Sequence, residues 1–406
     1  MKSVKDLNMN IVYISQHFPP EIGAAQGRAF DMAYFLAEEG NQVTMLTTFP
    51  NDRGTPQLFK KETIQGINVR RSFRIKDTKK SSMRRLANYF SFMASSILSG
   101  VFIKRQDIIY ATSPQLFVGV SGYVLSKIHR AKFVFEVRDL WVDFAEVLSQ
   151  FNNKRLLNLA RKLEMFLYKK ADMIVTVTYG YKERLITLGI PADKIKVVTN
   201  GVNPILLHQE QTTNIDIKEK YELTNKFIIL FAGNIGAAQG LDVLLDAALK
   251  IKNNKDIQFV LIGDGVEKER LKREADNLQL DNILILNSMP RSQLLDYYRA
   301  ADVCLISLKK HPLFEITIPS KVFDCMGMNK PVLIGVDGEA RTIIEDSNAG
   351  LYFKPEDSED LVEKINILFH NPTLLANMKR DMKETVLKRY NRRELAKGLS
   401  KTFNDL

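Results

Sequence analysis

Cysteine and histidine are scarce in this sequence, and their scarcity excludes several classes of protein. The 406 residues include two cysteines and five histidines. Two cysteines are too few for a disulfide scaffold, a zinc ribbon or a zinc finger. The histidines show no metal-ligand spacing, and neither an Asp-x-Asp triplet nor a Gly-Lys-Ser/Thr phosphate loop occurs. We therefore expect no metal-dependent catalysis and no P-loop hydrolysis of ATP.

The chain also lacks the extremes of composition that mark disordered or fibrous proteins. It is 45% hydrophobic and 26% charged, which is ordinary for a globular protein and excludes a collagen, a coiled coil and a disordered tail. Residues 1–15 are polar and then β-branched, so no secretory signal peptide is expected and a cytoplasmic location is predicted. At roughly 150 residues per domain, the length predicts two or three domains.

Positive charge is in excess. The 58 Lys and Arg residues outnumber the 47 Asp and Glu residues, which gives a formal net charge of +11. Such a surplus indicates a polyanionic partner: nucleic acid, an anionic membrane surface or a phosphorylated substrate. No platform of aromatic and basic residues and no groove-reading helix stands out, so nucleic acid is the least favoured of these partners.

Short apolar runs alternate with helical patterns along the whole chain. The runs without polar alternation are typical of strands buried on both faces, and strand–helix alternation predicts two doubly wound α/β domains. The polar segment 202–226 predicts a boundary, with domains at 1–205 and 206–385 and residues 386–406 as a candidate return to the first domain. Expected strands are 9–15, 41–48, 107–113, 132–139, 172–178 and 195–201, then 227–233, 257–265, 282–287, 302–308, 330–335 and 350–354.

One segment, 79–105, has basic ends around an uncharged centre at 86–103. A span of 18 residues is just long enough to raise the question of a transmembrane helix. It also holds polar residues and sits between strands of one domain, so we do not expect it to span. Two interpretations stay open: a helix on an anionic bilayer surface, and a buried helix whose ends are basic.

Three small-residue loops follow expected strands and are candidate anion sites. Gly23 and Gly27 lie after the first strand, Asn234 and Gln239 after the first strand of the second domain, and Gly263 after the next strand. Glycine lets a phosphate approach backbone N–H groups, and Asn or Gln can bind a phosphate or a sugar hydroxyl. Each loop also has a purely structural interpretation, either a turn that needs positive φ or, at Asp264, a helix N-cap.

The segment from Pro319 to Asp324 has a pattern that indicates an anion site more specifically. Pro319 and Ser320 indicate a helix start, which places Lys321 in the first turn, where the helix dipole disfavours a cation. A lysine there suggests a nearby anion. Asp324 follows one turn later on the same face, so lysine could meet a diphosphate and the carboxylate a ribose. An exposed Lys–Asp ion pair is the alternative.

Taken in order, these motifs resemble glycosyltransferase family 4, most closely the subgroup that builds O-antigen and capsule sugars and includes L-fucosamine transferases. The resemblance rests on HFPPEIGAA, VRDLWVD, VTNGVN, AGNIGAAQGLD, LIGDG and PSKVFDCM. It implies a GT-B fold, in which two Rossmann-like domains face each other across a cleft and the second binds the nucleotide sugar. It also implies transfer with retention at the anomeric carbon, without a metal or other cofactor.

The resemblance assigns roles to particular residues. It implies that Lys321 meets the donor diphosphate, that Asp324 holds the ribose, and that backbone near Met289 and Pro290 reads the base. The family's first carboxylate would fall at Ile316, so the adjacent Glu315 is our candidate. Arg138, followed by Asp139, stands where the family often has a histidine. Candidate catalytic residues are Lys321, Glu315, Asp139 and Arg138; candidate substrate-binding residues are Gly23, Ala24, Asn234, Gln239, Gly263, Met289, Pro290, Ser320 and Asp324.

From this we expect a glycosyltransferase that moves a sugar from a nucleotide-diphosphate sugar, UDP-linked, to a lipid-linked glycan acceptor. The acceptor is expected to be an undecaprenyl-diphosphate-linked glycan, met at the inner face of the cytoplasmic membrane through the 79–105 segment. Two alternatives remain: a nucleotide-sugar epimerase of the same fold, and a membrane-surface binding protein without catalysis.

Overall fold

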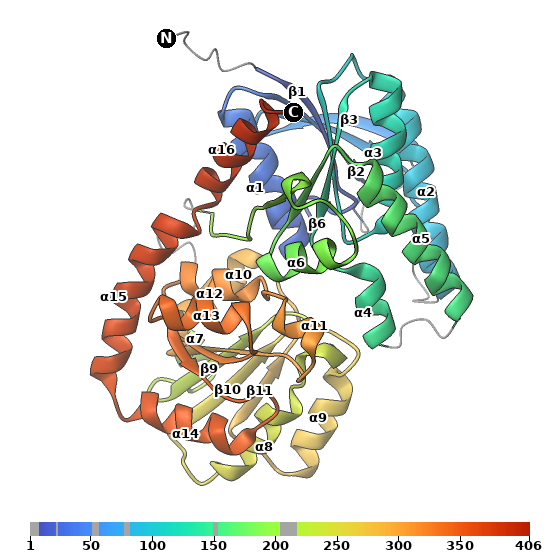
Figure 1. Ribbon diagram of the computed structural model, residues 1–406. Helices are drawn as coiled ribbons and strands as arrows, with labels where there is room; N and C mark the ends of the chain where they lie inside the picture. The colour runs from blue at the N-terminus through green and yellow to red at the C-terminus, as the bar shows by residue number, and fades with distance from the viewer. Residues whose placement is uncertain (1–7, 22, 51–56, 77–81, 149–152, 204–216) are drawn as a thin grey trace, which may run out of the picture. The chain divides into compact units, whose positions relative to one another are not determined.

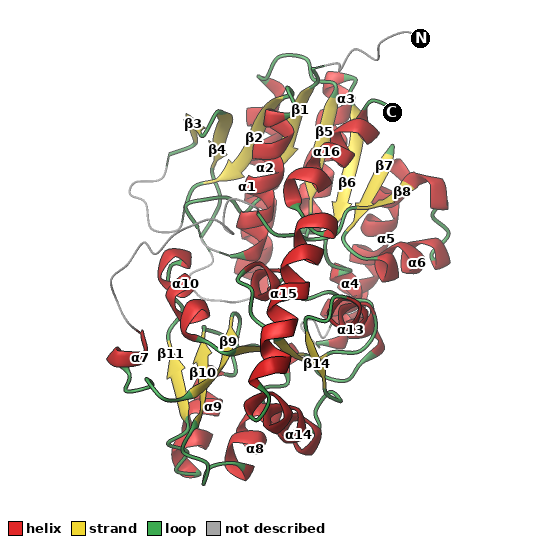
Figure 2. Cartoon of the chain, turned by 90° about the vertical axis from the view of Figure 1, so that its left-hand side faces the viewer, coloured by secondary structure: helices red, strands yellow, loops and turns green. Residues whose placement is uncertain are grey.

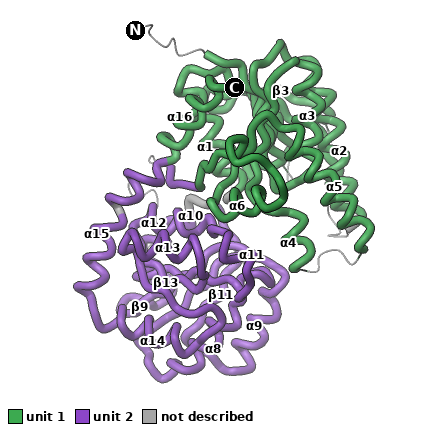
Figure 3. The backbone as a smooth tube through the Cα atoms, viewed as in Figure 1, with its two compact units in different colours: residues 1–199, 392–406 green, residues 200–391 purple. Residues whose placement is uncertain are grey.

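The computed structural model describes residues 8–21, 23–50, 57–76, 82–148, 153–203 and 217–406. The chain forms two compact units, which Figure 3 colours separately. Unit 1 comprises residues 1–199 and 392–406, and unit 2 comprises residues 200–391. The chain thus passes between the units at 199–200 and at 391–392, whereas the sequence suggested 205–206 and 385–386. The last helix belongs to unit 1.

In the described part of unit 1, eight strands form one sheet in the order β3-β4-β2-β1-β5-β6-β7-β8. All neighbours are parallel except the edge pair β3–β4. Every residue of β5 is buried, as expected of a strand covered on both faces. The strands are β1 (Asn10–Ile14), β2 (Gln42–Thr48), β3 (Phe59–Ile64), β4 (Ile67–Ser72), β5 (Ile108–Thr112), β6 (Lys132–Val137), β7 (Met173–Thr176) and β8 (Ile195–Val197).

Helices cover both faces of this sheet (Figure 1). On one face α2, α3 and α5 pack side by side, and on the other α1 packs against α16. The core beneath α1 and α16 includes Tyr13, Tyr110 and Phe403. The helices of unit 1 are α1 (Ala24–Glu38), α2 (Ser82–Val101), α3 (Leu116–His129), α4 (Trp141–Val147), α5 (Lys154–Lys170), α6 (Tyr179–Thr187), the 3-10 turn η1 (Ala192–Lys194) and α16 (Arg392–Phe403).

In the described part of unit 2, six parallel strands form one sheet in the order β11-β10-β9-β12-β13-β14. Figure 2 labels β9, β10, β11 and β14 of this sheet. Its strands are β9 (Phe227–Ala232), β10 (Ile257–Ile262), β11 (Ile283–Leu286), β12 (Val303–Ser307), β13 (Val332–Gly335) and β14 (Gly350–Tyr352). Its helices are α7 (Ile217–Lys220), η3 (Ala237–Gln239), α8 (Asp242–Lys250), α9 (Lys268–Asn277), α10 (Arg291–Ala300), α11 (Pro312–Glu315), α12 (Lys321–Gly327), α13 (Glu339–Asp346), α14 (Ser358–Phe369) and α15 (Pro372–Arg389).

All twelve strands expected from the sequence form, and the doubly wound α/β architecture is confirmed in each unit. The antiparallel hairpin β3–β4 was not foreseen. Its outer strand, FKKETI, is largely exposed and carries three charges, so it lacks the apolar run of the other strands. The two-residue turn between the strands, Gln65 and Gly66, has positive φ at both positions, which suits a tight hairpin.

The strand orders locate the edge where ligands bind in such folds. A doubly wound sheet opens a crevice at the carboxyl ends of the two strands between which the winding direction reverses. In unit 1 these strands are β1 and β5, and in unit 2 they are β9 and β12. The loops after these strands contain most of the residues singled out from the sequence.

Helix α2 occupies most of the uncharged centre of the 79–105 segment. Among the described helices, none is long and apolar enough to cross a membrane. One side of α2 is buried against α3, with Phe92 and Ser96 fully covered, while Met83, Phe90 and Leu98 are exposed. The helix is therefore neither wholly buried nor spanning: it presents an apolar stripe to solvent.

Candidate functional site

The first part of the site is the loop that follows β9 in unit 2. Gly233 has a φ of 144°, and a Cβ there would lie 2.3 Å from Cε of Lys321. A Cβ on Gly263, at the end of β10, would lie 1.8 Å from the Gly233 carbonyl oxygen. Both positions therefore exclude any larger residue. The glycines bring the ends of β9 and β10 together and leave room for the lysine.

Lys321 is the central cation of this site. It is the first residue of α12, as the sequence predicted, with Ser320 at the N-cap making no side-chain cap bond. Its Nζ lies 3.8 Å from the centroid of the buried Phe231 ring. No described carboxylate forms an ion pair with it. Burial lowers the pKa of Lys321 to about 7, because the interactions with Cys325 and Asp324 offset only part of the desolvation.

The polar side chains near Lys321 differ in their exposure and in the hydrogen bonds that they form. The Gln239 Oε1 accepts a hydrogen bond of 3.1 Å from the Gly236 N–H, so this side chain shapes its own loop. Asn234 is exposed, and its Nδ2 lies against Gly236. Asp324 is half-buried on the same helix as Lys321. The structure thus brings Asn234, Lys321 and Asp324 to one edge of the sheet of unit 2.

A polar network that the sequence did not reveal joins the ends of β10 and β11. Lys268 Nζ lies 2.8 Å from Asp264 Oδ1 and 2.5 Å from Asn287 Oδ1. The Ser288 backbone N–H and hydroxyl also donate to Asp264. These hydrogen bonds, from Lys268 first and then Ser288, lower the pKa of Asp264. The expected N-cap role of Asp264 is wrong, because Glu267 occupies the N-cap of α9.

This network fixes the backbone just before Met289 and Pro290, the residues assigned to the base. Met289 is half-buried, whereas Pro290 is exposed at the N-cap of α10. Lys268 is 8% exposed, whereas the side chain of Asp264 is exposed, so the ion pair has one buried and one exposed partner. The i, i+4 spacing of Asp264 and Lys268 was the signal in the sequence that could have disclosed it.

Glu315 ends the short helix α11 and is exposed. It lines a small hollow after β12 together with Lys309, Lys310 and His311. A Cβ on Gly338, which has a φ of 73°, would lie 2.0 Å from the Glu315 carbonyl oxygen, so the backbone of α11 is held tightly against the loop after β13. The structure therefore places Glu315 on the same sheet edge as Lys321.

The unit 1 candidates gather around the start of α1. Gly23 is the N-cap of α1 and Ala24 its first residue. Arg138, after β6, donates from Nη1 to the Ala25 carbonyl at 3.4 Å and from its backbone N–H to Ser113 Oγ at 2.7 Å. Arg138 is thereby tied to the first turn of α1 and to the loop after β5.

Asp139, the next residue, is half-buried, and no described group donates a hydrogen bond to its carboxylate. Burial raises the pKa of Asp139 to about 6, and the charge of Arg138 opposes this only in part. A half-buried carboxylate that receives no hydrogen bond from the described residues can accept one from a ligand hydroxyl.

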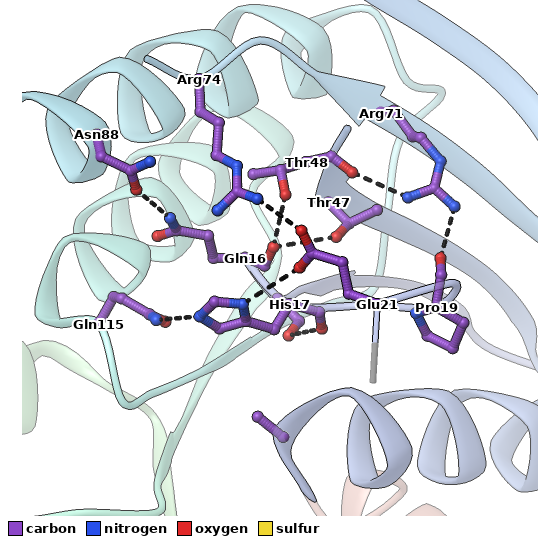
Figure 4. A network of polar contacts seen from close by, with 12 residues as sticks. Gln16, His17, Pro19, Glu21, Thr47, Thr48, Arg71, Arg74, Asn88 and Gln115 are labelled. Atoms are coloured by element: carbon purple, nitrogen blue, oxygen red, sulfur yellow. Dashed lines mark hydrogen bonds and ion pairs between the residues drawn. The ribbon is translucent and has the colours of Figure 1, made fainter. Parts of the chain in front are cut away.

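Sequence reasoning missed a second network in unit 1, at the carboxyl ends of β1, β4 and β5 (Figure 4). Glu21 Oε1 accepts from Arg74 Nη2 at 2.8 Å, and Glu21 Oε2 lies 3.7 Å from His17 Nδ1. Gln115 Nε2 lies 2.6 Å from His17 Nε2. These residues lie at the edge of the sheet where doubly wound folds bind ligands. His17 and Glu21, four residues apart directly after a strand, were the available signal.

Two family models match the chain. The model described as Glycosyltransferase Family 4 matches residues 25–205, and the one described as Glycosyl transferases group 1 matches residues 213–388. The chain belongs to glycosyltransferase family 4. It is accordingly a glycosyltransferase, and the epimerase and the non-catalytic binding protein considered from the sequence are not supported.

Curated and solved relatives agree with this assignment. The chain is 23% identical over 340 residues to the colanic acid biosynthesis glycosyl transferase WcaI of Escherichia coli K12, covering 80% of this chain and 83% of WcaI. It is 25% identical over 294 residues to the glycosyltransferase WbjE of Pseudomonas aeruginosa, covering 70% and 71%. The crystal structure of Anabaena HepE in complex with UDP and glucose superposes with a TM-score of 0.73 at 18% identity, covering 98% of this chain and all of HepE. The fold is therefore GT-B.

Proposed function

We propose that this family 4 glycosyltransferase is retaining and metal-independent, and that it transfers a sugar from a UDP-linked donor to a lipid-linked glycan during surface polysaccharide synthesis. The observation that carries the proposal is Lys321. It is a half-buried cation that lies against a ring and a glycine and has no carboxylate partner among the described residues. Such a cation lacks a counter-ion, and a donor diphosphate supplies one.

On the donor side, the bond between the anomeric carbon and the phosphate oxygen breaks, and negative charge grows on the departing diphosphate. The Lys321 ammonium stabilises that charge. Gly233 and Gly263 contribute by leaving room for the lysine, because their own N–H groups already donate to the carbonyls of Ile262 and Leu286. Asp324 accepts hydrogen bonds from the ribose hydroxyls. The backbone at Met289, fixed through Asp264, contacts the base. Glu315 faces the transferred sugar and stabilises the positive charge on its ring.

On the acceptor side, Asp139 accepts a hydrogen bond from an acceptor hydroxyl and Arg138 holds the loop at Gly23 in place. The departing phosphate takes the acceptor's proton, so the chain needs no separate general base. Retention follows, because attack then comes from the face that the phosphate leaves. Among the described residues, no group of three or more His, Cys, Asp or Glu is placed to hold a metal ion.

The relatives support the choice of donor and pathway. HepE has been crystallised with UDP and with UDP-glucose, and WcaI is named for colanic acid biosynthesis. The HepE complexes support a UDP-linked donor for this chain, and the name of WcaI supports a role in polysaccharide synthesis.

The outer side of α2 supports a membrane-bound acceptor. Phe102, 74% exposed, follows the exposed Leu98 and Val101, and the basic Lys104 and Arg105 come next in the chain. Apolar side chains with adjoining cations favour an anionic bilayer surface. Asn88, near the start of α2, accepts a hydrogen bond of 2.5 Å from Gln16 in the loop after β1. The helix is thus joined to the acceptor side of unit 1, as a peripheral enzyme with an undecaprenyl-diphosphate-linked acceptor requires.

The test is incubation with a panel of nucleotide sugars and a bacterial membrane extract. Release of free UDP together with a larger glycolipid is expected from one donor, and Lys321→Ala should lose both. Donor conversion without any acceptor would instead show epimerisation. Flotation with phosphatidylglycerol vesicles tests the membrane: Phe102→Ser should float less than the native chain, while Val266→Ser, at an exposed valine of unit 2, should float normally. Equal flotation of all three would contradict the role of α2.

A further inference from the structure

A second pocket lies in unit 1, at the sheet edge opposite the candidate site. Its volume is about 410 Å³. Asn10 and Gln42, the first residues of the parallel strands β1 and β2, line it, so it opens at the amino ends of the strands. Candidate residues such as His17 and Asp139 follow the carboxyl ends. The pocket therefore does not belong to the reaction site.

Three cations line this pocket: Lys61 on β3, Arg70 on β4 and Lys104 after α2. Lys61 and Arg70 are directly opposite each other in the antiparallel β3–β4 pair. Like charges in that position destabilise a sheet. Arg70 donates to the Ser99 carbonyl at 3.3 Å. No described carboxylate forms an ion pair with any of the three cations.

The one carboxylate in the lining, Glu62, is already engaged. It lies 2.8 Å from Lys60 Nζ and 2.5 Å from Arg71 Nε. Adjacent side chains of a strand point to opposite faces, so Lys60 and Lys61 are on different sides of β3. Glu62 therefore does not pair with Lys61, Arg70 or Lys104, and the carboxylate of Asp107 is bonded to Asn10 rather than to a cation of the pocket.

The pocket also offers neutral polar groups. Gln106 is buried, and its Nε2 donates to the carbonyls of Lys104 and Arg105, but its Oε1 has no partner. The Gln106 Oε1 can accept a hydrogen bond from a hydroxyl or an N–H group. The remaining uncharged polar lining consists of Asn10, Gln42, Thr44, Thr63 and Asn68. Amides and hydroxyls beside cations match a ligand that carries both an anionic group and hydroxyls.

We propose that this pocket is a second binding site, which takes a phosphate attached to a polyhydroxylated body. Lys61, Arg70 and Lys104 bind the phosphate, and Gln106 accepts from a hydroxyl. A soluble sugar phosphate and the glycerol-phosphate headgroup of an anionic lipid share this chemistry. The exposed Val101 and Phe102, next to the pocket residue Ile103, lie where a lipid headgroup's chains would begin.

The experiment uses the full chain and two matched variants. Lys61→Thr removes one cation from the pocket, and Lys60→Thr removes the adjacent lysine from the other side of the strand. Calorimetry with glucose 1-phosphate and with glycerol 1-phosphate measures the soluble source. Co-sedimentation with phosphatidylcholine vesicles, with and without phosphatidylglycerol, measures the lipid source.

The proposal expects the native chain and Lys60→Thr to bind at least one probe, and Lys61→Thr to bind it about tenfold more weakly. Binding confined to the phosphatidylglycerol vesicles would assign the ligand to the lipid, and binding of the soluble probes would assign it to a sugar phosphate. Without ligand, Lys61→Thr should melt at a higher temperature than the native chain, because the repulsion from Arg70 is relieved. Failure of every probe, or equal weakening by both variants, would overturn the proposal without touching the donor site.

Discussion

The Nζ of Lys321 lies 3.8 Å from the centroid of the Phe231 ring. A cation over an aromatic face gains some electrostatic stabilisation, but less than a carboxylate provides. The ring therefore makes burial of this ammonium tolerable without neutralising it. The pKa of about 7 leaves the lysine close to half-protonated at neutral pH, and an arriving diphosphate would raise it.

Loss of the Lys321 charge should slow transfer. Lys321→Ala is expected to cost on the order of 3 kcal/mol in the transition state, which is about a hundredfold in turnover at saturating donor. Lys321→Arg keeps a charge that does not titrate, so it should remove the decline in kcat/KM that the native chain shows as pH rises above about 7. Steady-state rates measured across pH test the predictions for both variants. If Lys321→Ala turned over as fast as the native chain, Lys321 would not be the residue that meets the diphosphate.

Lys321 should also lower the free energy of unfolding of the native chain. Its folded-state pKa lies below the unfolded value of 10.5, so the unfolded chain binds more protons between these values and stability rises with pH there. Below about 7 the full cost is present. Lys321→Met should therefore raise the free energy of unfolding at neutral pH, on the order of 2 kcal/mol.

Lys330 provides the matched control for that measurement. Burial lowers its pKa to about 8, yet its Nζ donates to the carbonyls of Arg299 and Ala301 at 2.8 and 2.7 Å. Lys330→Met leaves both carbonyls without this donor, so it should destabilise by roughly 1–3 kcal/mol. Opposite signs for the two lysines, measured by urea unfolding, distinguish a ligand-binding cation from a structural one.

Substitution of Asp324 should weaken nucleotide binding more than it slows sugar transfer. Asp324→Asn is expected to weaken UDP binding about tenfold, because a charged acceptor of ribose hydroxyls becomes neutral. The native chain should also discriminate against 2′-deoxy-UDP, and the variant should lose that preference. Calorimetry with both nucleotides decides the matter: equal discrimination by both proteins would place the ribose elsewhere.

For Asp139 we predict that stability changes with pH in the direction opposite to that for Lys321. Its pKa rises from 3.8 to about 6 on folding, so the native state binds the extra proton and stability falls as pH rises through this window. Asp139→Asn should be more stable than the native chain above about pH 6, by roughly 1–2 kcal/mol, and similar near pH 4. Transfer by the native chain should decline below about pH 6, as the acceptor contact is protonated.

The core of unit 1 contains a buried ion pair that should govern acid unfolding. Glu136 accepts from Arg28 Nη2 at 2.7 Å and from the Tyr110 hydroxyl at 2.7 Å. Burial alone would raise the pKa of Glu136, but Arg28, Arg138 and the hydrogen bonds together lower it below 4.5. This stability is present above 4.5 and is lost as pH falls through the lower folded value. Glu136→Gln should cost about 3–5 kcal/mol at neutral pH, measured by chemical denaturation.

Parts of the fold could be predicted from the sequence because buried parallel strands leave apolar runs. The runs at β1 and β9 were read correctly for this reason. The hairpin β3–β4 was missed because its outer strand is exposed and charged. An edge strand of this kind gives no apolar signal.

The candidate site likewise contains residues that could be predicted from the sequence and residues that could not. Lys321 was found because a cation at a helix start conflicts with the helix dipole, which is a local rule. The Asp264–Lys268 pair has a local i, i+4 spacing that was not used, whereas its link to Asn287 depends on the pairing of β10 with β11, which leaves no fixed spacing in the sequence. The orientation of Glu21 toward Arg74, 53 residues away, is likewise set by the sheet order.

Proton uptake on UDP binding tests the central claim most directly. Calorimetry at about pH 8, in buffers of different ionisation enthalpy, measures how many protons enter the complex. If Lys321 meets the diphosphate, the native chain should take up close to one proton, and Lys321→Arg, already charged, should bind UDP with almost none. Tight UDP binding with the same uptake in both proteins would contradict the account.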